Sequence, residues 1–78
     1  MVIRLNNIEK VKNFVNKISK IDAKVDLVSG RYVVDAKSIM GIFSLDLEKP
    51  LTVRVISGDV DAVCNLVKEF ADNTVKVA

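Results

Sequence analysis

Two stretches of the chain, residues 8–21 and 60–71, carry apolar side chains at the i, i+3, i+4, i+7 spacing of an α-helix with one buried stripe. The apolar positions are Ile8, Val11, Phe14, Val15, Ile18 and Ile21 in the first stretch, then Val60, Val63, Cys64, Val67, Phe70 and Ala71 in the second. A helix that is apolar on one side only must cover another element. The two stretches therefore predict helices that lie over a sheet.

Four short segments have the composition of β-strands. They are residues 2–5, 25–28, 31–35 and 51–56. The first is a β-branched run that ends at the turn-favouring pair Asn6-Asn7, and either asparagine can cap the helix that follows. The second and third flank Ser29-Gly30 and predict a β-hairpin, while the fourth alternates apolar and polar residues with period two. Together the four segments can form the sheet that the helices need.

A single domain covering residues 1–78 is expected from this length. With a short helix after Ser38, the element order is β-α-β-β-α-β-α. The expected fold class is α+β: an open-faced β-sandwich with a four-stranded antiparallel sheet, helices on one face and solvent on the other. The last four residues, 75–78, fit either a frayed tail or a short strand.

Composition excludes several classes of function. The 12 basic and 10 acidic residues nearly balance, so no strong field attracts nucleic acid or an anionic membrane. Histidine is absent, which rules out imidazole catalysis and histidine-ligated metal sites. Cys64 is the only cysteine, which excludes an intramolecular disulfide and fits a reducing cytosol. Its place in the apolar stripe of the last helix is interpreted as that of a small buried hydrophobe. No apolar run is long enough to span a membrane, and we expect a cytoplasmic protein without a cofactor or metal.

The segment from Asp35 to Leu45 is the most informative about function. The Ser38 side-chain oxygen can accept from backbone N–H groups two or three residues ahead, as a helix N-cap does. Pro50 limits the helix that follows to about two turns. Four large apolar side chains crowd this element: Ile39, Met40, Ile42 and Phe43. So short a helix cannot bury all four, and one or two should be exposed. The pattern leaves open whether they form a contact surface or part of the core.

The motif Lys37-Ser38-Ile39-Met40-Gly41, followed by Ser44-Leu45, resembles that of HPr, the histidine-containing phosphocarrier protein of the bacterial sugar phosphotransferase system. Residues 25–27 before the motif and residues 58–62 at the start of the last helix extend the resemblance over nearly the whole chain. The resemblance implies the family's β-α-β-β-α-β-α sandwich and a protein that is not an enzyme.

The chain departs from the family at the phosphate-carrying centre. HPr proteins carry the phosphoryl group on the histidine of a Gly-x-His-Ala-Arg-Pro-Ala motif at the start of the first helix. An ungapped alignment from the Ser38 motif places Asn7 at this histidine, Glu9 at the arginine and Lys10 at the proline. An amide cannot accept and release a phosphoryl group, and Glu9 would repel one. We therefore expect no catalytic residue and no ordinary phosphocarrier activity.

The resemblance implies a regulatory role for Ser38. In HPr of low-GC Gram-positive bacteria, the matching serine is phosphorylated by HPr kinase/phosphorylase, and the phosphoserine form is a corepressor for the catabolite control regulator. The related protein Crh lacks the carrier histidine and keeps this serine. A Crh-like regulator of carbon catabolite repression is thus predicted, phosphorylated at Ser38 and binding protein partners through Ile39, Met40 and Phe43.

Three alternatives stay open from the sequence. The chain could be a divergent HPr paralogue that binds partners through the helix of residues 38–43 without phosphate. It could be a phosphocarrier that uses a substitute residue. The lysine-rich face of the first helix could bind nucleic acid or an acidic partner, although the near-zero net charge argues against this.

Overall fold

The computed structural model describes residues 1–71 of the 78-residue chain. Its elements are β1 (Val2–Ile3), α1 (Ile8–Ile18), β2 (Ala23–Ser29), β3 (Tyr32–Asp35), α2 (Ile39–Phe43), β4 (Leu51–Gly58) and α3 (Val60–Phe70). The predicted order β-α-β-β-α-β-α is confirmed. The tail or strand expected at residues 75–78 lies outside the described residues.

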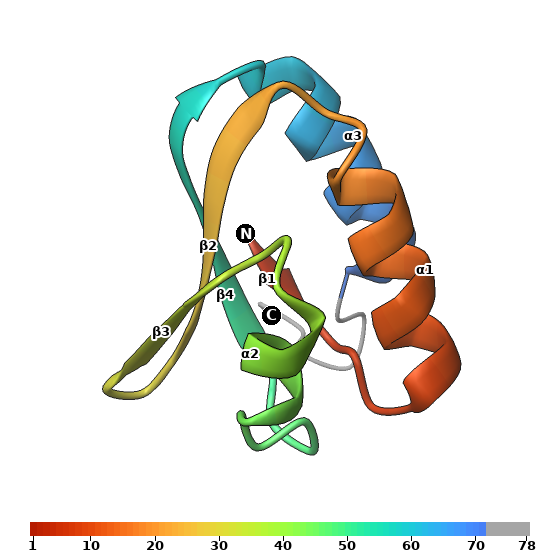
Figure 1. The fold of residues 1–78 in the computed structure, drawn as a ribbon, viewed down its shortest axis with the longest axis vertical. Helices are drawn as coiled ribbons and strands as arrows, with labels where there is room; N and C mark the ends of the chain where they lie inside the picture. Colours follow the sequence, from red (N-terminus) through yellow and green to blue (C-terminus); the bar gives the residue numbers. More distant parts are fainter. Residues whose placement is uncertain (72–78) are drawn as a thin grey trace, which may run out of the picture.

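The four strands form one antiparallel sheet in the order β1-β4-β2-β3. Helices α1 and α3 lie side by side over one face of this sheet, and no helix of the described part covers the other face (Figure 1). The predicted α+β open-faced sandwich is therefore correct. The β2–β3 hairpin projects at one corner of the sheet, and the short helix α2 lies near it.

The core lies between the sheet and the two long helices. Phe14 of α1 and Phe70 of α3 meet edge to face, with ring centroids 5.4 Å apart and planes at 90°. Such aromatic pairs add about 0.5–1.5 kcal/mol beyond the burial of their area. The largest fully buried side chains are Phe14, Ile3, Leu5, Ile18, Leu27, Ile42, Leu51, Val11, Val25 and Val63. Valine, isoleucine and leucine thus build nearly the whole interior, as the composition requires.

Both long helices begin at the expected caps. The Asn7 side chain accepts from the Lys10 N–H at 2.8 Å, and the Asp59 side chain accepts from the Ala62 N–H at 3.1 Å. Helix α1 ends at Ile18 rather than at Ile21, because the chain tightens into a turn in which the Ile21 N–H bonds the Ile18 carbonyl. Ile21 still packs against the core from this turn.

The interpretation of Cys64 as a buried hydrophobe is wrong in detail. Cys64 is half-buried, and its Sγ lies 3.6 Å from Met1 Sδ, whereas Leu66 is buried. The buried stripe of α3 therefore runs through Val63, Leu66 and Val67, and Val60 is exposed. Both stripes have helical spacing, so periodicity could not set the rotation of α3. Contacts with α1, β1 and β4 decide it.

The hairpin turn also differs by one residue from its prediction. Ser29 pairs with Tyr32, so the central turn residues are Gly30 and Arg31 instead of Ser29 and Gly30. Gly30 has φ of 59°, and positive φ at the first central position fits a type II′ hairpin turn. The strand β2 consequently extends through Ser29.

Gly58 is required at the end of β4, and its replacement tests the fold. Gly58 has φ of 98°, and a Cβ there would lie 2.4 Å from Ala23 Cα and from the Asp22 carbonyl oxygen. We expect Gly58→Ala to lower the free energy of unfolding by about 3 kcal/mol or more, from strain and overpacking together. Gly30→Ala is the matched control, because φ is also positive there but nothing lies within 4 Å of the added Cβ, so it should cost about 1 kcal/mol. Urea unfolding measures both, and equal losses would contradict the steric argument.

Candidate functional site

Helix α2 is a five-residue helix held at both ends by serines. Ser38 has extended backbone angles and its Oγ accepts from the Gly41 N–H at 3.1 Å, so the predicted N-cap is confirmed. At the other end, the Ser44 hydroxyl donates to the Gly41 carbonyl at 2.6 Å. A helix this short is marginal by itself, so its stability depends on these caps and on packing.

Packing fixes one side of α2 on the body of the protein. Ile42 is fully buried, and Ile39 is half-buried against the core. A Cβ at Gly41 would lie 3.2 Å from Val34 Cβ and 3.1 Å from Ser38 Oγ. Glycine therefore allows α2 to lie close against β3, with which it is in contact.

The opposite side of α2 exposes the two side chains that cannot be buried. Met40 is 78% exposed and Phe43 is 42% exposed. The expectation that one or two of the four apolar residues would reach solvent is thus confirmed. The exposed apolar surface comes mainly from Met40 and Phe43, since Ile39 of the predicted contact set faces partly inward.

Ser38 presents an exposed hydroxyl at the start of this helix. The side chain of its neighbour Lys37 is engaged elsewhere, because the Lys37 ammonium donates to the Ile21 carbonyl at 2.9 Å. The Lys37 N–H bonds Asp35 Oδ1 and the Ser38 N–H bonds the Asp35 carbonyl, which together form the turn that leads from β3 into α2. The hydroxyl thus lies on a structured turn and is open to solvent.

Asn7, Glu9 and Lys10 lie at the start of α1, where the resemblance places the carrier motif. All three are exposed, and the Asn7 side chain is engaged in its cap bond to the Lys10 N–H. Helix α1 is in contact with α2, and its first turn lies at the same end of the molecule as α2 (Figure 1). Ile8 adds a further exposed apolar side chain to this end.

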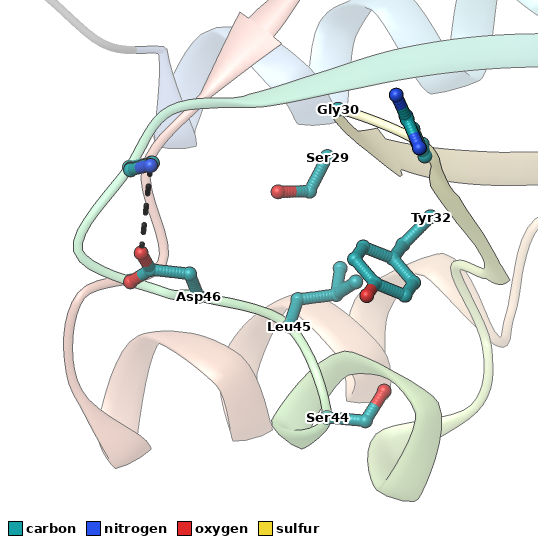
Figure 2. A pocket seen from close by; sticks show the side chains of 8 residues that line it. Ser29, Gly30, Tyr32, Ser44, Leu45 and Asp46 are labelled. Carbon is teal, nitrogen blue, oxygen red and sulfur yellow. Dashed lines mark ion pairs between the residues drawn. The ribbon is translucent and has the colours of Figure 1, made fainter.

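A hollow of about 430 Å³ next to α2 was not foreseen from the sequence. It opens between the hairpin turn and the loop after α2, and Figure 2 shows its lining. The lining residues are Ser29, Gly30, Arg31, Tyr32, Ser44, Leu45, Asp46 and Lys49. Lys49 Nζ lies 3.9 Å from Asp46 Oδ2 at its rim. The two segments that line the hollow are far apart in the sequence, so the sequence did not show that they meet. The only signal was that each segment has the composition of a turn.

Within residues 1–71, no three cysteine, aspartate or glutamate side chains gather where they could hold a metal ion. No helix in the same part of the chain is long and apolar enough to cross a membrane. What the region around α2 offers chemically is an exposed hydroxyl, two exposed apolar side chains and a hollow with a mixed polar and apolar lining.

Comparison with known proteins identifies the family. A family model described as the PTS HPr component phosphorylation site matches residues 9–73. The chain belongs to the HPr family. Among solved structures, the crystal structure of HPr-C-His from Thermoanaerobacter tengcongensis is similar, with a TM-score of 0.69 and 25% sequence identity over 88% of this chain and 90% of that chain. A search of curated proteins finds no match.

Membership in the HPr family confirms the resemblance drawn from the Ser38 motif. HPr proteins are phosphocarriers of the phosphotransferase system and act with other proteins rather than as catalytic enzymes. The family match begins at Glu9, so Asn7 lies just before the matched residues.

The structural role of Ser38 can be measured apart from any modification. We expect Ser38→Ala to lower the free energy of unfolding by about 1 kcal/mol, because the cap bond to the Gly41 N–H is lost. Ser38→Asp is the control, since aspartate is an equally good N-cap and should keep most of this stability. Urea unfolding followed by circular dichroism compares the two. Equal losses in both variants would contradict the capping role.

Proposed function

We propose that this HPr-family protein is a non-enzymatic regulator whose binding to protein partners is controlled by phosphorylation of Ser38. The observation that supports it is the exposed Ser38 hydroxyl at the start of a helix whose outer side exposes Met40 and Phe43. A modified residue and an apolar contact surface lie on the same short element. The proposal treats residues 1–78 as one domain acting in the cytoplasm.

A phosphate on Ser38 would change this surface strongly. It adds a charge of about −1.5 to −2 and three acceptor oxygens, which bind arginine well. Because Lys37 is held by the Ile21 carbonyl, the adjacent ammonium is not placed to neutralise the phosphate. The group would therefore remain available to a basic side chain of the partner.

Met40 and Phe43 supply the contact area for that partner. Exposed methionine and phenylalanine are typical of protein contacts, because they bury much apolar area and adapt to different shapes. The partners proposed are an HPr kinase/phosphorylase, which would modify Ser38, and a regulator of carbon catabolite repression, which would bind the modified form. Neither nucleic acid nor a membrane is required.

The proposal assigns no carrier activity to the start of α1. Asn7 presents an amide there, and its oxygen accepts the cap bond from the Lys10 N–H. Glu9, in the first turn, places negative charge where a phosphoryl group would have to bind. The helix start thus keeps a capping function while it has no histidine to accept a phosphoryl group.

A second candidate function is a partner-binding module that works without phosphate. It is favoured by the fact that Met40 and Phe43 are already exposed in the unmodified protein and lie on the helix that ends beside the hollow lined by Tyr32 and Ser44. A partner could use this surface as it stands.

A kinase assay tests the main proposal. Incubation of the full chain with ATP and an HPr kinase/phosphorylase should add one phosphate, detected by intact mass, and Ser38→Ala should abolish the addition. Ser44→Ala is the matched control, because Ser44 is the exposed hydroxyl at the other end of α2 and its loss should leave phosphorylation unchanged. An unmodified wild-type chain, or phosphate that persists in Ser38→Ala, would count against the proposal.

Binding of variants separates the two functions. The probes are an HPr kinase/phosphorylase and a catabolite control regulator, titrated calorimetrically. If the surface works without phosphate, Phe43→Ala should weaken binding about tenfold, as loss of an aromatic anchor does, while Ser38→Ala should have no effect. Val60→Ala is the control, because Val60 is a similarly exposed apolar residue at the start of α3. If binding instead appears only after Ser38 is phosphorylated, the regulatory function is supported.

A further inference from the structure

Strand β3 is an open edge of the sheet. The strand order β1-β4-β2-β3 places β3 last, and no element of residues 1–71 pairs with its outer side. Tyr32 and Val33 are 72% and 49% exposed. An edge strand that contains no proline or bulge presents backbone groups on which another strand can pair.

The register shows which backbone groups are free for such pairing. The Ala36 N–H bonds the Val25 carbonyl at 2.9 Å, so Asp26 and Asp35 form a pair of the type that exchanges no direct hydrogen bonds. Pair types alternate along an antiparallel ladder, so Val28 and Val33 form the same type. The N–H and C=O of Val33 therefore point away from β2, toward the open edge.

The end of this edge after Val33 is partly closed. The Asp35 carbonyl points the same way as that of Val33, but it accepts the Ser38 N–H at 3.0 Å. The other end of the edge, before Val33, is open, because the chain enters β3 there from the hairpin turn at Gly30. The free edge is thus short and centred on Val33.

Charge is unevenly distributed across the sheet at this edge. Asp26 and Asp35 lie directly opposite each other on neighbouring strands, and like charges in this position are destabilising. Asp26 has a counterion, because Arg54 Nη2 lies 3.7 Å from its Oδ2. No basic side chain of residues 1–71 forms an ion pair with Asp35. Asp35, which is the outer of the two carboxylates, therefore has no counterion from this part of the chain on the side of the open edge.

We propose that β3 is a self-association edge, on which two copies of the chain pair β3 with β3 in antiparallel orientation about a two-fold axis at Val33. In this register Val33 faces Val33 of the second copy, and the two residues can exchange both hydrogen bonds. Arg31 comes opposite Asp35 of the second copy, and Tyr32 comes opposite Val34. The symmetry repeats each of these last two contacts.

The edge is complementary to itself in both charge and packing. Arg31 of the second copy would lie beside Asp35, which has no counterion of its own among residues 1–71. Across the joined sheets the charged residues would then follow in the order Arg54, Asp26, Asp35 and Arg31 of the second copy. On the helix-covered face, the exposed Tyr32 would pack on the β-branched Val34, a favourable cross-strand pair. A foreign peptide would use the backbone groups equally well, but it would not by itself supply the arginine that this register requires. The observations therefore favour a second copy as the occupant.

Sedimentation equilibrium of the full chain from micromolar to millimolar concentration tests the proposal. The average mass should rise with concentration from the monomer value of 8.6 kDa toward twice that value. Arg31→Glu should weaken the association about tenfold or more, because both attractive pairs become repulsive. The double variant R31E/D35R should restore it, since the charges are exchanged and their complementarity is kept.

A matched control distinguishes this edge from a general effect of net charge. Lys24→Glu makes the same change of charge at an exposed position of β2 away from the free edge and should leave association unchanged. Circular dichroism confirms that each variant is folded. Arg31 lies in an exposed turn, so we expect Arg31→Glu to leave the fold intact, and its effect can then be assigned to association. A monomer at every concentration would overturn the proposal, and so would a dimer that Arg31→Glu leaves intact.

Discussion

The edge-to-face contact of Phe14 with Phe70 joins the two long helices into one layer, and the rest of the structure is arranged around it. With only four aromatic residues in the chain, this pair and the surrounding valine, isoleucine and leucine side chains make up most of the core. Because α1 and α3 together cover the sheet, little buried area is left for a third helix. Helix α2 is accordingly small and is anchored mainly by Ile42.

This peripheral position explains why α2 exposes apolar side chains. A helix that buries one residue fully and must still accommodate Met40 and Phe43 exposes apolar surface by necessity. Its caps keep the backbone ordered, so the exposed side chains are presented from a defined position. At the neighbouring start of α1, Asn7 has the same structural role as Ser38, a side-chain oxygen that caps a helix.

Most of the fold could be predicted because its signals are local. The caps at Asn7, Ser38 and Asp59 follow from side-chain oxygens placed just before apolar helical runs. The errors arose where two local patterns fit equally well. Cys64 and Leu66 lie on neighbouring stripes of α3, and either could have faced the core from periodicity alone. The candidate site was predicted in part: the Ser38 cap and the exposed side chains of α2 were foreseen, but the adjoining hollow was not.

The sequence by itself determined the chemistry that is present: no histidine, an amide at residue 7, a serine before a short apolar helix and a nearly balanced charge. It also determined the order of the elements, because helical and strand periodicities are local properties of the chain. Only the tertiary structure decided that β3 is an edge strand, that Asp35 lies opposite Asp26, and that the hairpin turn meets the loop after α2. These features depend on strand order, helix rotation and contacts between distant segments, which packing selects among alternatives of equal local preference.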